Sequence, residues 1–163
     1  MGKTIIRIDN CAFTKNPALI KSAKYMPADV ETSIENGHFV EIGGLLEGER
    51  EVHKAITPTA ITDYFGIVCT PELEYDERGY HGLDTYENKA GQVIRVGVLQ
   101  KGDIYSTTVE GFDKAPVVGN LVELQAGTKA KVVNTATEGA TQVGKVIAVE
   151  TVGRFTFYVV EVQ

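Results

Sequence analysis

Residues 119–163 constrain the fold of this chain most strongly, because strand-like runs alternate there with turn signals. The run 155–163 (FTFYVVEVQ) is rich in aromatic and β-branched residues, which favour a pleated, packed surface. The stretch before it is punctuated by glycines at 127, 139, 144 and 153. We therefore predict successive antiparallel strands, with 155–163 forming a buried strand that ties this part of the chain into a core.

Turn signals recur roughly every 8–12 residues through the second half of the chain, the rhythm of an antiparallel barrel or sandwich. The predicted fold class is mainly β: an antiparallel β-barrel or sandwich with an N-terminal arm and at most short helices. The expected organisation is an arm over residues 1–28, a β subdomain with an acidic, Tyr-rich loop over 29–92, and the barrel or sandwich over 93–163.

Two local signals stand out before residue 40. Asn36-Gly37 is the strongest hairpin signal in the chain, since both residues tolerate positive φ. Asn16-Pro17 provides an N-cap followed by a proline in the first turn, which would start a short helix over 18–26. Nine residues are too few to decide between that helix and an extended arm.

Charge is distributed unevenly along the chain. Residues 1–28 carry five basic side chains and one acidic one, a net charge of +4, whereas 29–87 carry a net charge of −11 and 88–163 a net charge of +1. A basic segment beside an acidic one suggests contact with an acidic neighbour, either another copy or a partner. The alternative is that residues 1–28 fold onto the acidic middle of their own chain.

Two groups of residues are candidates for an intermolecular interface. In the first, lysines would steer residues 1–28 to a partner and apolar side chains would hold them there: Lys15, Leu19, Ile20, Lys21, Lys24, Tyr25 and Met26. The second is the Tyr-rich loop, because Tyr offers large contact area with few torsions to freeze: Tyr75, Tyr80 and Tyr86. The alternative for these tyrosines is an ordinary role in the core.

No pattern typical of catalysis or of a cofactor site is found in the sequence, so we expect a non-enzymatic protein without cofactors or metals. His38, His53 and His81 have no metal-ligand spacing and are expected on exposed loops. Carboxylates at 72, 74 and 76 could hold a divalent cation if extended, but an acidic, solvated edge is commoner. Without a secretory signal, Cys11 and Cys69 are expected as reduced thiols, although a disulfide stays possible.

Nucleic acid and membranes are not expected as partners. The sequence pI is about 5.1 and the bases of residues 1–28 are too scattered to line a groove. No apolar run approaches the roughly 18 residues that a membrane span needs.

Three stretches in this order resemble head proteins of tailed bacteriophages, in particular the small capsid decoration, or cement, proteins: 48–55 (GEREVHKA), 101–106 (KGDIYS), and 144–150 (GKVIAVE) with the run 155–162. The resemblance is densest from residue 101 onward and assigns no individual functional residue. It implies a protein made in the host cytoplasm that binds the major capsid protein on the outside of the virion and reinforces the shell. Such proteins are often homotrimers, and some use an N-terminal arm.

Two other functions compete with this one. A ligand-binding β-module for carbohydrate or a host surface would use the Tyr-rich loop. A small β-barrel hydrolase or lyase would assemble its site from separated acids and histidines.

Overall fold

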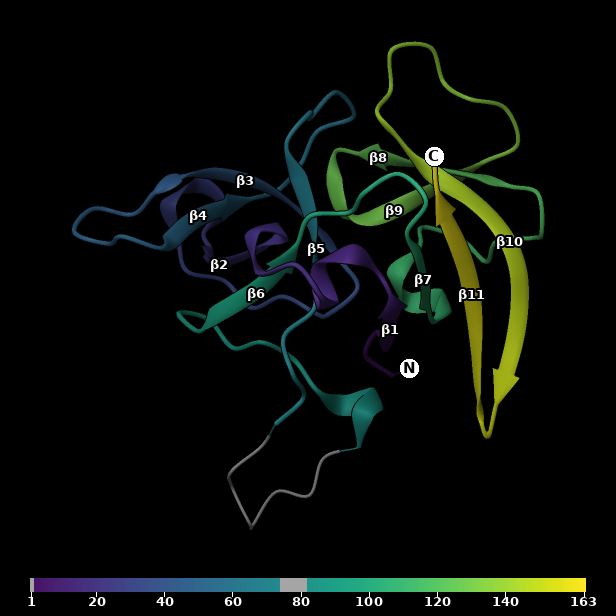
Figure 1. The fold of residues 1–163 in the computed structure, drawn as a ribbon, viewed down its shortest axis with the longest axis horizontal. Coiled ribbons are helices and arrows are strands. Elements are labelled where there is room, and N and C mark those ends of the chain that lie inside the picture. Colours follow the sequence, from purple (N-terminus) through teal and green to yellow (C-terminus); the bar gives the residue numbers. More distant parts are fainter. Residues whose placement is uncertain (1, 74–81) are drawn as a thin grey trace.

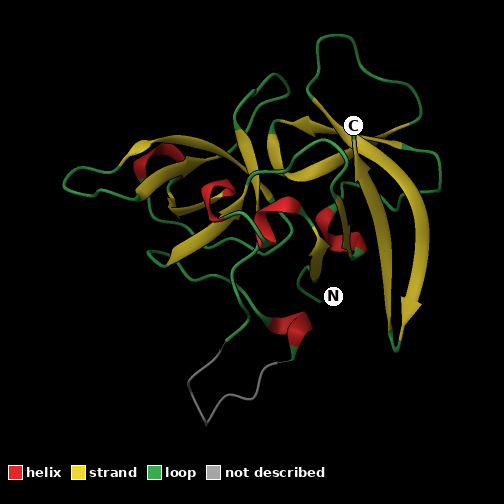
Figure 2. Ribbon diagram, viewed as in Figure 1, coloured by secondary structure: helices red, strands yellow, loops and turns green. Residues whose placement is uncertain are grey.

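The structure, a computed structural model, describes residues 2–73 and 82–163. The mainly β prediction is confirmed: the described residues form eleven strands, and their only helices are five single 3₁₀ turns of three residues each. The strands form a closed barrel and a six-stranded sheet. Figure 1 shows the barrel strands β2–β6 on one side of the molecule and β7–β11 on the other, and Figure 2 shows that the helices are short turns in the connections between strands.

The barrel closes in the order β2-β4-β3-β5-β6, and its strands are β2 (Ile20–Tyr25), β3 (Phe39–Leu45), β4 (Val52–Ile56), β5 (Phe65–Val68) and β6 (Val93–Gly97). Neighbouring strands are antiparallel except β2 and β4, which run parallel from Ser22 opposite Val52 to Tyr25 opposite Ala55. The barrel has no free edge, because β6 pairs with both β2 and β5.

The second sheet is antiparallel in the order β1-β7-β11-β10-β8-β9, and its strands are β1 (Ile6–Asn10), β7 (Ile104–Thr107), β8 (Leu121–Gln125), β9 (Gly127–Val133), β10 (Gln142–Val152) and β11 (Phe155–Val162). The longest strands, β10 and β11, form a hairpin that extends away from the barrel (Figure 1). The strand predicted over 155–163 is therefore present, in the interior of this sheet.

The short helices are η1 (Ala12–Thr14), η2 (Pro17–Leu19), η3 (Pro27–Asp29), η4 (Leu83–Thr85) and η5 (Val109–Gly111). The Asn16-Pro17 signal produces η2, where the Asn16 side chain accepts a hydrogen bond from the Ala18 N–H. This helix lasts a single turn, and the chain continues directly into strand β2.

The prediction of an N-terminal arm is wrong. Residues 1–28 contribute β1, which pairs with β7, and β2, which lies between β4 and β6 in the barrel. The net charge of +4 over residues 1–28 suggested a basic arm. In β2, however, Lys24 alternates with Ala23 and Tyr25, which are buried in the barrel core.

Two of the five basic residues of this segment pair with acids of the acidic stretch 29–87. Lys3 lies 3.2 Å from both Glu35 and Glu87, and Lys24 lies 3.3 Å from Glu31. All three acids belong to the acidic stretch 29–87. The structure thus realises the alternative in which residues 1–28 fold onto their own acidic middle.

The expected boundary between residues 92 and 93 falls immediately before β6. The partners of β6 are β2 and β5, on the other side of that boundary. The barrel therefore takes its strands from residues 20–97 and the sheet from residues 6–10 and 104–162.

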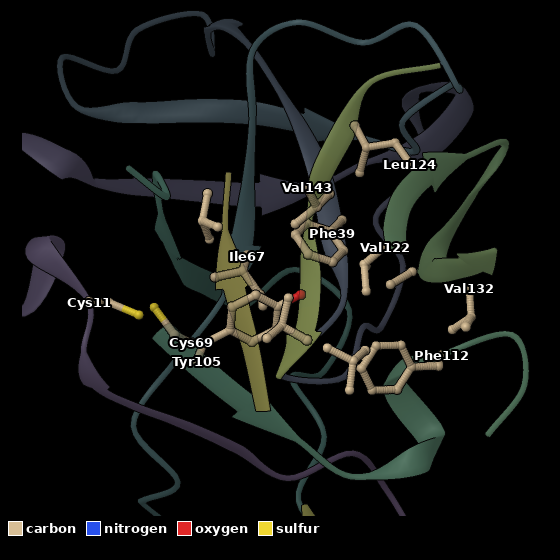
Figure 3. Close-up of a cluster of buried hydrophobic side chains, with 14 of the residues drawn as sticks. Cys11, Phe39, Ile67, Cys69, Tyr105, Phe112, Val122, Leu124, Val132 and Val143 are labelled. Carbon is tan, nitrogen blue, oxygen red and sulfur yellow. The ribbon is translucent and has the colours of Figure 1, made fainter. Parts of the chain in front are cut away.

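One hydrophobic core lies between the barrel and the sheet. It contains Phe39 and Ile67 from the barrel with Tyr105, Val122 and other residues from the sheet (Figure 3). The Phe39 ring meets the Tyr105 ring edge-on, with centroids 6.3 Å apart. A second cluster fills the barrel interior: Ala23, Tyr25, Ile34, Val40, Ile42, Ala55, Val68, Ile94 and Val96. The two β layers therefore pack as one unit.

The Asn36-Gly37 signal forms a turn but not a hairpin. Gly37 has the positive φ, +79°, that the dipeptide predicts. Asn36 is buried, however, and its side chain donates to the Thr70 carbonyl, at 2.7 Å, and accepts from the Asn88 amide, at 3.0 Å. Asn36 thus holds together three segments that are distant in sequence.

Close packing of β10 against β11 predicts different outcomes for two alanine substitutions. A Cβ at Gly144 in β10 would overlap the backbone carbonyl of Glu161, which cannot move without breaking the ladder. At Gly127 in β9 it would meet only the Gln125 side chain, 4.0 Å away. We expect Gly144→Ala to lower the free energy of unfolding by about 1–3 kcal/mol. Gly127→Ala should change it by less than about 1 kcal/mol. Urea unfolding measures both, and equal stabilities would contradict the packing described.

Candidate interaction surface

The apolar residues predicted to anchor an interface lie mainly within the core. Leu19 and Ile20 pack against the cluster between barrel and sheet, and Tyr25 is buried in the barrel with its hydroxyl 2.7 Å from Thr57 Oγ1. Met26 is half-buried and donates its backbone N–H to Ala55. Of the predicted lysines, Lys15 is exposed, whereas Lys21 and Lys24 are half-buried on β2. The structure therefore does not gather these residues on one exposed face.

The predicted Tyr-rich site is only partly within the described residues. Tyr86 is half-buried and accepts a hydrogen bond of 3.3 Å from the Gln92 amide. Tyr75 and Tyr80 lie outside the described residues, as do Glu74 and Asp76 of the acidic cluster. Glu72, the remaining member of that cluster, accepts a hydrogen bond of 3.2 Å from Asn36.

A surface that the sequence did not single out is the far part of the β10–β11 hairpin. β8 pairs with β10 only from Gln142 to Lys145. The backbone of Val146 still bonds to Gly119 and Asn120. Beyond Val146 the outer edge of β10 has no strand partner within the described ranges, although β11 pairs with it as far as Val152. Three large apolar side chains on this length of β10 are exposed: Ile147, Val149 and Val152. We call them the hairpin surface.

The hairpin is held in position from its other side. Arg7 of β1 lies 5.4 Å from the centre of the Phe157 ring and 3.4 Å from a Glu150 carboxylate oxygen. Near the turn, Arg154 lies over the Phe155 ring at 4.8 Å and pairs with Asp84 at 3.1 Å. Each contact is modest on its own, since exposed ion pairs and cation–π contacts contribute about 1 kcal/mol or less. The contacts of Arg7 and the Arg154–Asp84 pair together brace the hairpin against β1 and η4.

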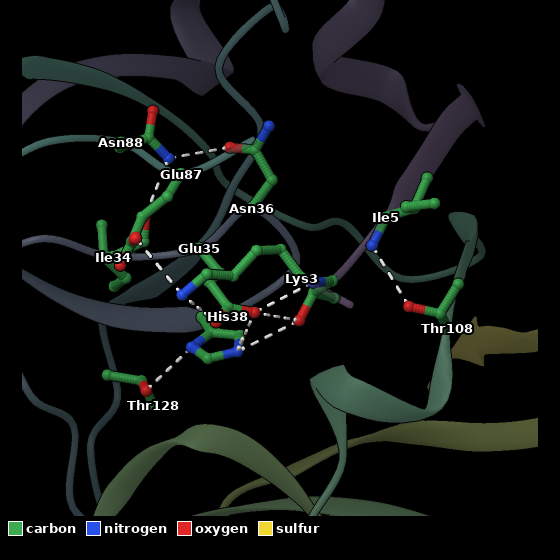
Figure 4. A network of polar contacts seen from close by, with 11 residues as sticks. Lys3, Ile5, Ile34, Glu35, Asn36, His38, Glu87, Asn88, Thr108 and Thr128 are labelled. Carbon is green, nitrogen blue, oxygen red and sulfur yellow. Dashed lines mark hydrogen bonds and ion pairs between the residues drawn. The ribbon is translucent and has the colours of Figure 1, made fainter. Parts of the chain in front are cut away.

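A network of polar contacts around Glu35 and His38 lies at the junction of β1, β3 and β9 (Figure 4). The Glu35 carboxylate accepts two hydrogen bonds from Thr4, one from its N–H at 2.9 Å and one from its hydroxyl at 2.8 Å. His38 lies between Thr4, 3.3 Å from Nε2, and Thr128, 3.0 Å from Nδ1. The network joins residues from three separate parts of the chain at the start of β1.

Burial controls the charge of this network. Only 7% of His38 is exposed, and desolvation lowers its pKa to about 4, despite the nearby Glu35 carboxylate. Burial alone would raise the pKa of Glu35, but its two hydrogen bonds from Thr4 reverse the direction and the pKa is lowered. At neutral pH the network therefore contains a neutral imidazole and a charged carboxylate. The expectation of an exposed loop histidine is wrong for His38, because the Asn36-Gly37 turn directs it inward.

A groove of about 390 Å³ opens beside this network. Its apolar walls include Val109 and Phe112, and its charged lining mixes both signs: Lys3, Lys114 and Lys129 with Glu35, Glu110 and Asp113. The mixture of charges gives the groove no preference for a cationic or an anionic ligand, so it is a weaker candidate site than the hairpin surface.

A second buried charge, Glu123, lies in the middle of β8 and is fully buried. Its carboxylate accepts from Lys131 Nζ at 3.0 Å, from the Thr137 N–H at 3.1 Å and from the Gln142 amide at 2.8 Å. Burial raises the pKa of Glu123, but these hydrogen bonds outweigh it and lower the pKa to about 2. The ionised carboxylate thus fastens the loop between β9 and β10 to the sheet.

The buried imidazole of His38 predicts a loss of stability in mild acid. In the unfolded chain its pKa is near 6.5, and in the folded protein about 4. The contribution of His38 to the free energy of unfolding is therefore fully present above pH 6.5. It is lost as the pH falls to 4, a change on the order of 3 kcal/mol. We expect His38→Gln to show a shallower loss of unfolding free energy than the wild type between these pH values. Identical slopes in urea titrations would show that His38 does not titrate in this way.

The Glu123 network predicts that neutralising this carboxylate is harmful even with the shape preserved. Glu123→Gln replaces an acceptor oxygen with an NH₂ group that faces donors, and we expect a loss of about 1–3 kcal/mol. Glu138→Gln, at an exposed position in the adjoining loop, is the matched control and should change stability by less than about 0.5 kcal/mol. Thermal and urea unfolding measure the stability of both variants. A Glu123→Gln variant as stable as the wild type would contradict the ionised state of Glu123.

Within residues 2–73 and 82–163, the structure has no group of three or more His, Cys, Asp and Glu side chains placed to hold a metal ion. Among the helices in these ranges, none is long and apolar enough to cross a membrane. Comparison of this chain with protein-family models, with curated proteins and with solved structures gave no match.

Proposed function

We propose that this chain is a non-enzymatic structural protein that attaches to the outer surface of a phage capsid and stabilises the shell, with the major capsid protein as its partner. The observation that carries the proposal is the hairpin surface: a braced strand edge that exposes Ile147, Val149 and Val152. Exposed apolar edge strands are normally avoided in monomers, because they template pairing with another chain. Such an edge suits a protein whose partner covers it.

The form of attachment follows from the strand geometry. An extended segment of a partner can add to the free edge of β10 through main-chain hydrogen bonds, while alternate side chains contact the apolar residues. Apolar contact would supply most of the affinity, since exposed charge pairs add little. The hairpin also lies within residues 101–163, where the sequence resemblance to capsid decoration proteins is densest. Self-association into a homotrimer would repeat the same surface around a shell.

The test is binding of the purified protein to empty capsids of the phage that carries its gene, measured by co-sedimentation. A carboxylate in the interface would be desolvated without a partner, so we expect Val149→Asp to weaken binding at least tenfold. Val30→Asp, at a valine 63% exposed on the barrel side of the molecule, should bind like the wild type. Melting temperatures of both variants establish that each is folded.

The outcomes separate the alternatives. A wild-type protein that does not bind capsids would contradict the proposed function. Capsid binding that is equally strong for Val149→Asp would keep the function but exclude the hairpin surface as the site of attachment. Binding to a glycan array without capsid binding would favour a ligand-binding β-module.

A further inference from the structure

The two cysteines, 58 residues apart in sequence, meet in the core between the barrel and the sheet. Cys11 follows β1 and Cys69 follows β5, and both are at least 96% buried in the same cluster. Figure 3 shows their sulfur atoms facing each other. Both are free thiols in this structure. We propose that Cys11 and Cys69 form an intramolecular disulfide when the chain folds under oxidising conditions.

The backbone at both positions is fixed by hydrogen bonds. Cys11 donates its N–H to the Ile8 carbonyl at 3.1 Å, and its own carbonyl accepts from the Thr14 N–H at 3.1 Å. Cys69 donates its N–H to the Arg95 carbonyl at 2.9 Å. Neither residue lies on an exposed loop, so the native fold itself holds the two thiols opposite each other. A disulfide depends on such an arrangement, because its geometry tolerates little variation.

The folded protein is a poor substrate for oxidation. Burial raises the pKa of both thiols to about 12, and the proximity of Cys69 contributes to the shift at Cys11. The thiolate is the reactive species, so the native thiols react slowly with disulfides in solution. The bond therefore forms while the chain is folding or transiently open.

The reaction is thiol–disulfide exchange with a small-molecule disulfide such as oxidised glutathione. One cysteine thiolate attacks the reagent and forms a mixed disulfide, releasing one glutathione thiolate. The other cysteine thiolate then attacks the protein sulfur of that mixed disulfide and releases the second glutathione. The two cysteines lose two protons and two electrons, and oxidised glutathione is reduced to two glutathione molecules.

The bond would close a loop containing four of the five barrel strands, from β2 to β5. Closing a long loop restricts the unfolded chain, which stabilises the folded state if the native geometry accepts the bond. It would also join the segment after β1 of the sheet covalently to the barrel. A protein exposed outside a host cell would then keep its two layers together after partial unfolding.

The experiment refolds the full chain from urea in a mixture of reduced and oxidised glutathione, with dithiothreitol as the reducing arm. Intact mass spectrometry and non-reducing gels identify the product, and circular dichroism gives its melting temperature. We expect an oxidised monomer lighter by two hydrogen atoms that melts several degrees above the reduced protein, with the gain reversed by dithiothreitol. Folded, reduced protein placed in the same buffer should oxidise far more slowly.

Cys11→Ser and Cys69→Ser are the matched controls. Each should give a free thiol or a glutathione adduct, with no increase in melting temperature in the oxidising arm. For each chain, the melting temperature in the oxidising arm is compared with that in the reducing arm. A folding defect caused by the substitution itself is present in both arms and does not affect this difference. An oxidised monomer that melts below the reduced protein would overturn the proposal. So would a product consisting only of linked dimers, glutathione adducts or free thiols.

Discussion

The contact between Phe39 of β3 and Tyr105 of β7 joins the two β layers of this protein. Their edge-on rings bring the barrel and the sheet into one core, to which both halves of the chain contribute. Tyr105 is so deeply buried that its hydroxyl finds no hydrogen-bond partner in the described part of the chain. A buried hydroxyl without a hydrogen-bond partner costs about 1–3 kcal/mol of stability. Packing of the Tyr105 ring must outweigh this cost. The braced hairpin and the groove both depend on this core, since it contains Val146 and Val160 of the hairpin strands and Phe112 of the groove wall.

The strands that could be predicted from the sequence are those whose patterns are local. β11 is an uninterrupted aromatic and β-branched run, and it forms where 155–163 predicted it. β2 (IKSAKY) could not be recognised in the same way, because its lysines suggested a solvated arm. Its identity as a strand depends on β4 and on β6, about 30 and 70 residues further along the chain. Local propensity contains no information about such partners.

The candidate sites were harder to predict, because their residues meet only in the folded chain. Glu123 occupies an ordinary position in a strand sequence (LVELQ), and the partners that keep it ionised lie 8 to 19 residues away without a recognisable spacing. The hairpin surface is exposed because β8 begins only at Leu121, opposite Lys145, and a strand boundary of this kind is not visible in the sequence of β10 itself. A signal for His38 was present in the sequence: the neighbouring Asn36-Gly37 turn, whose Asn proved to be buried between distant segments.

The order of strands in the sheet has a consequence for how the protein is made. Among the described strands β1 pairs only with β7, about 100 residues later, and the other neighbour of β7 is β11. During synthesis β1 therefore waits, unpaired, until β7 has emerged, and the centre of the sheet is completed only when β11 has followed. Pairings of such long range fold slowly. The nascent chain thus exposes strand edges for an extended period, in which premature association with a neighbouring chain competes with folding.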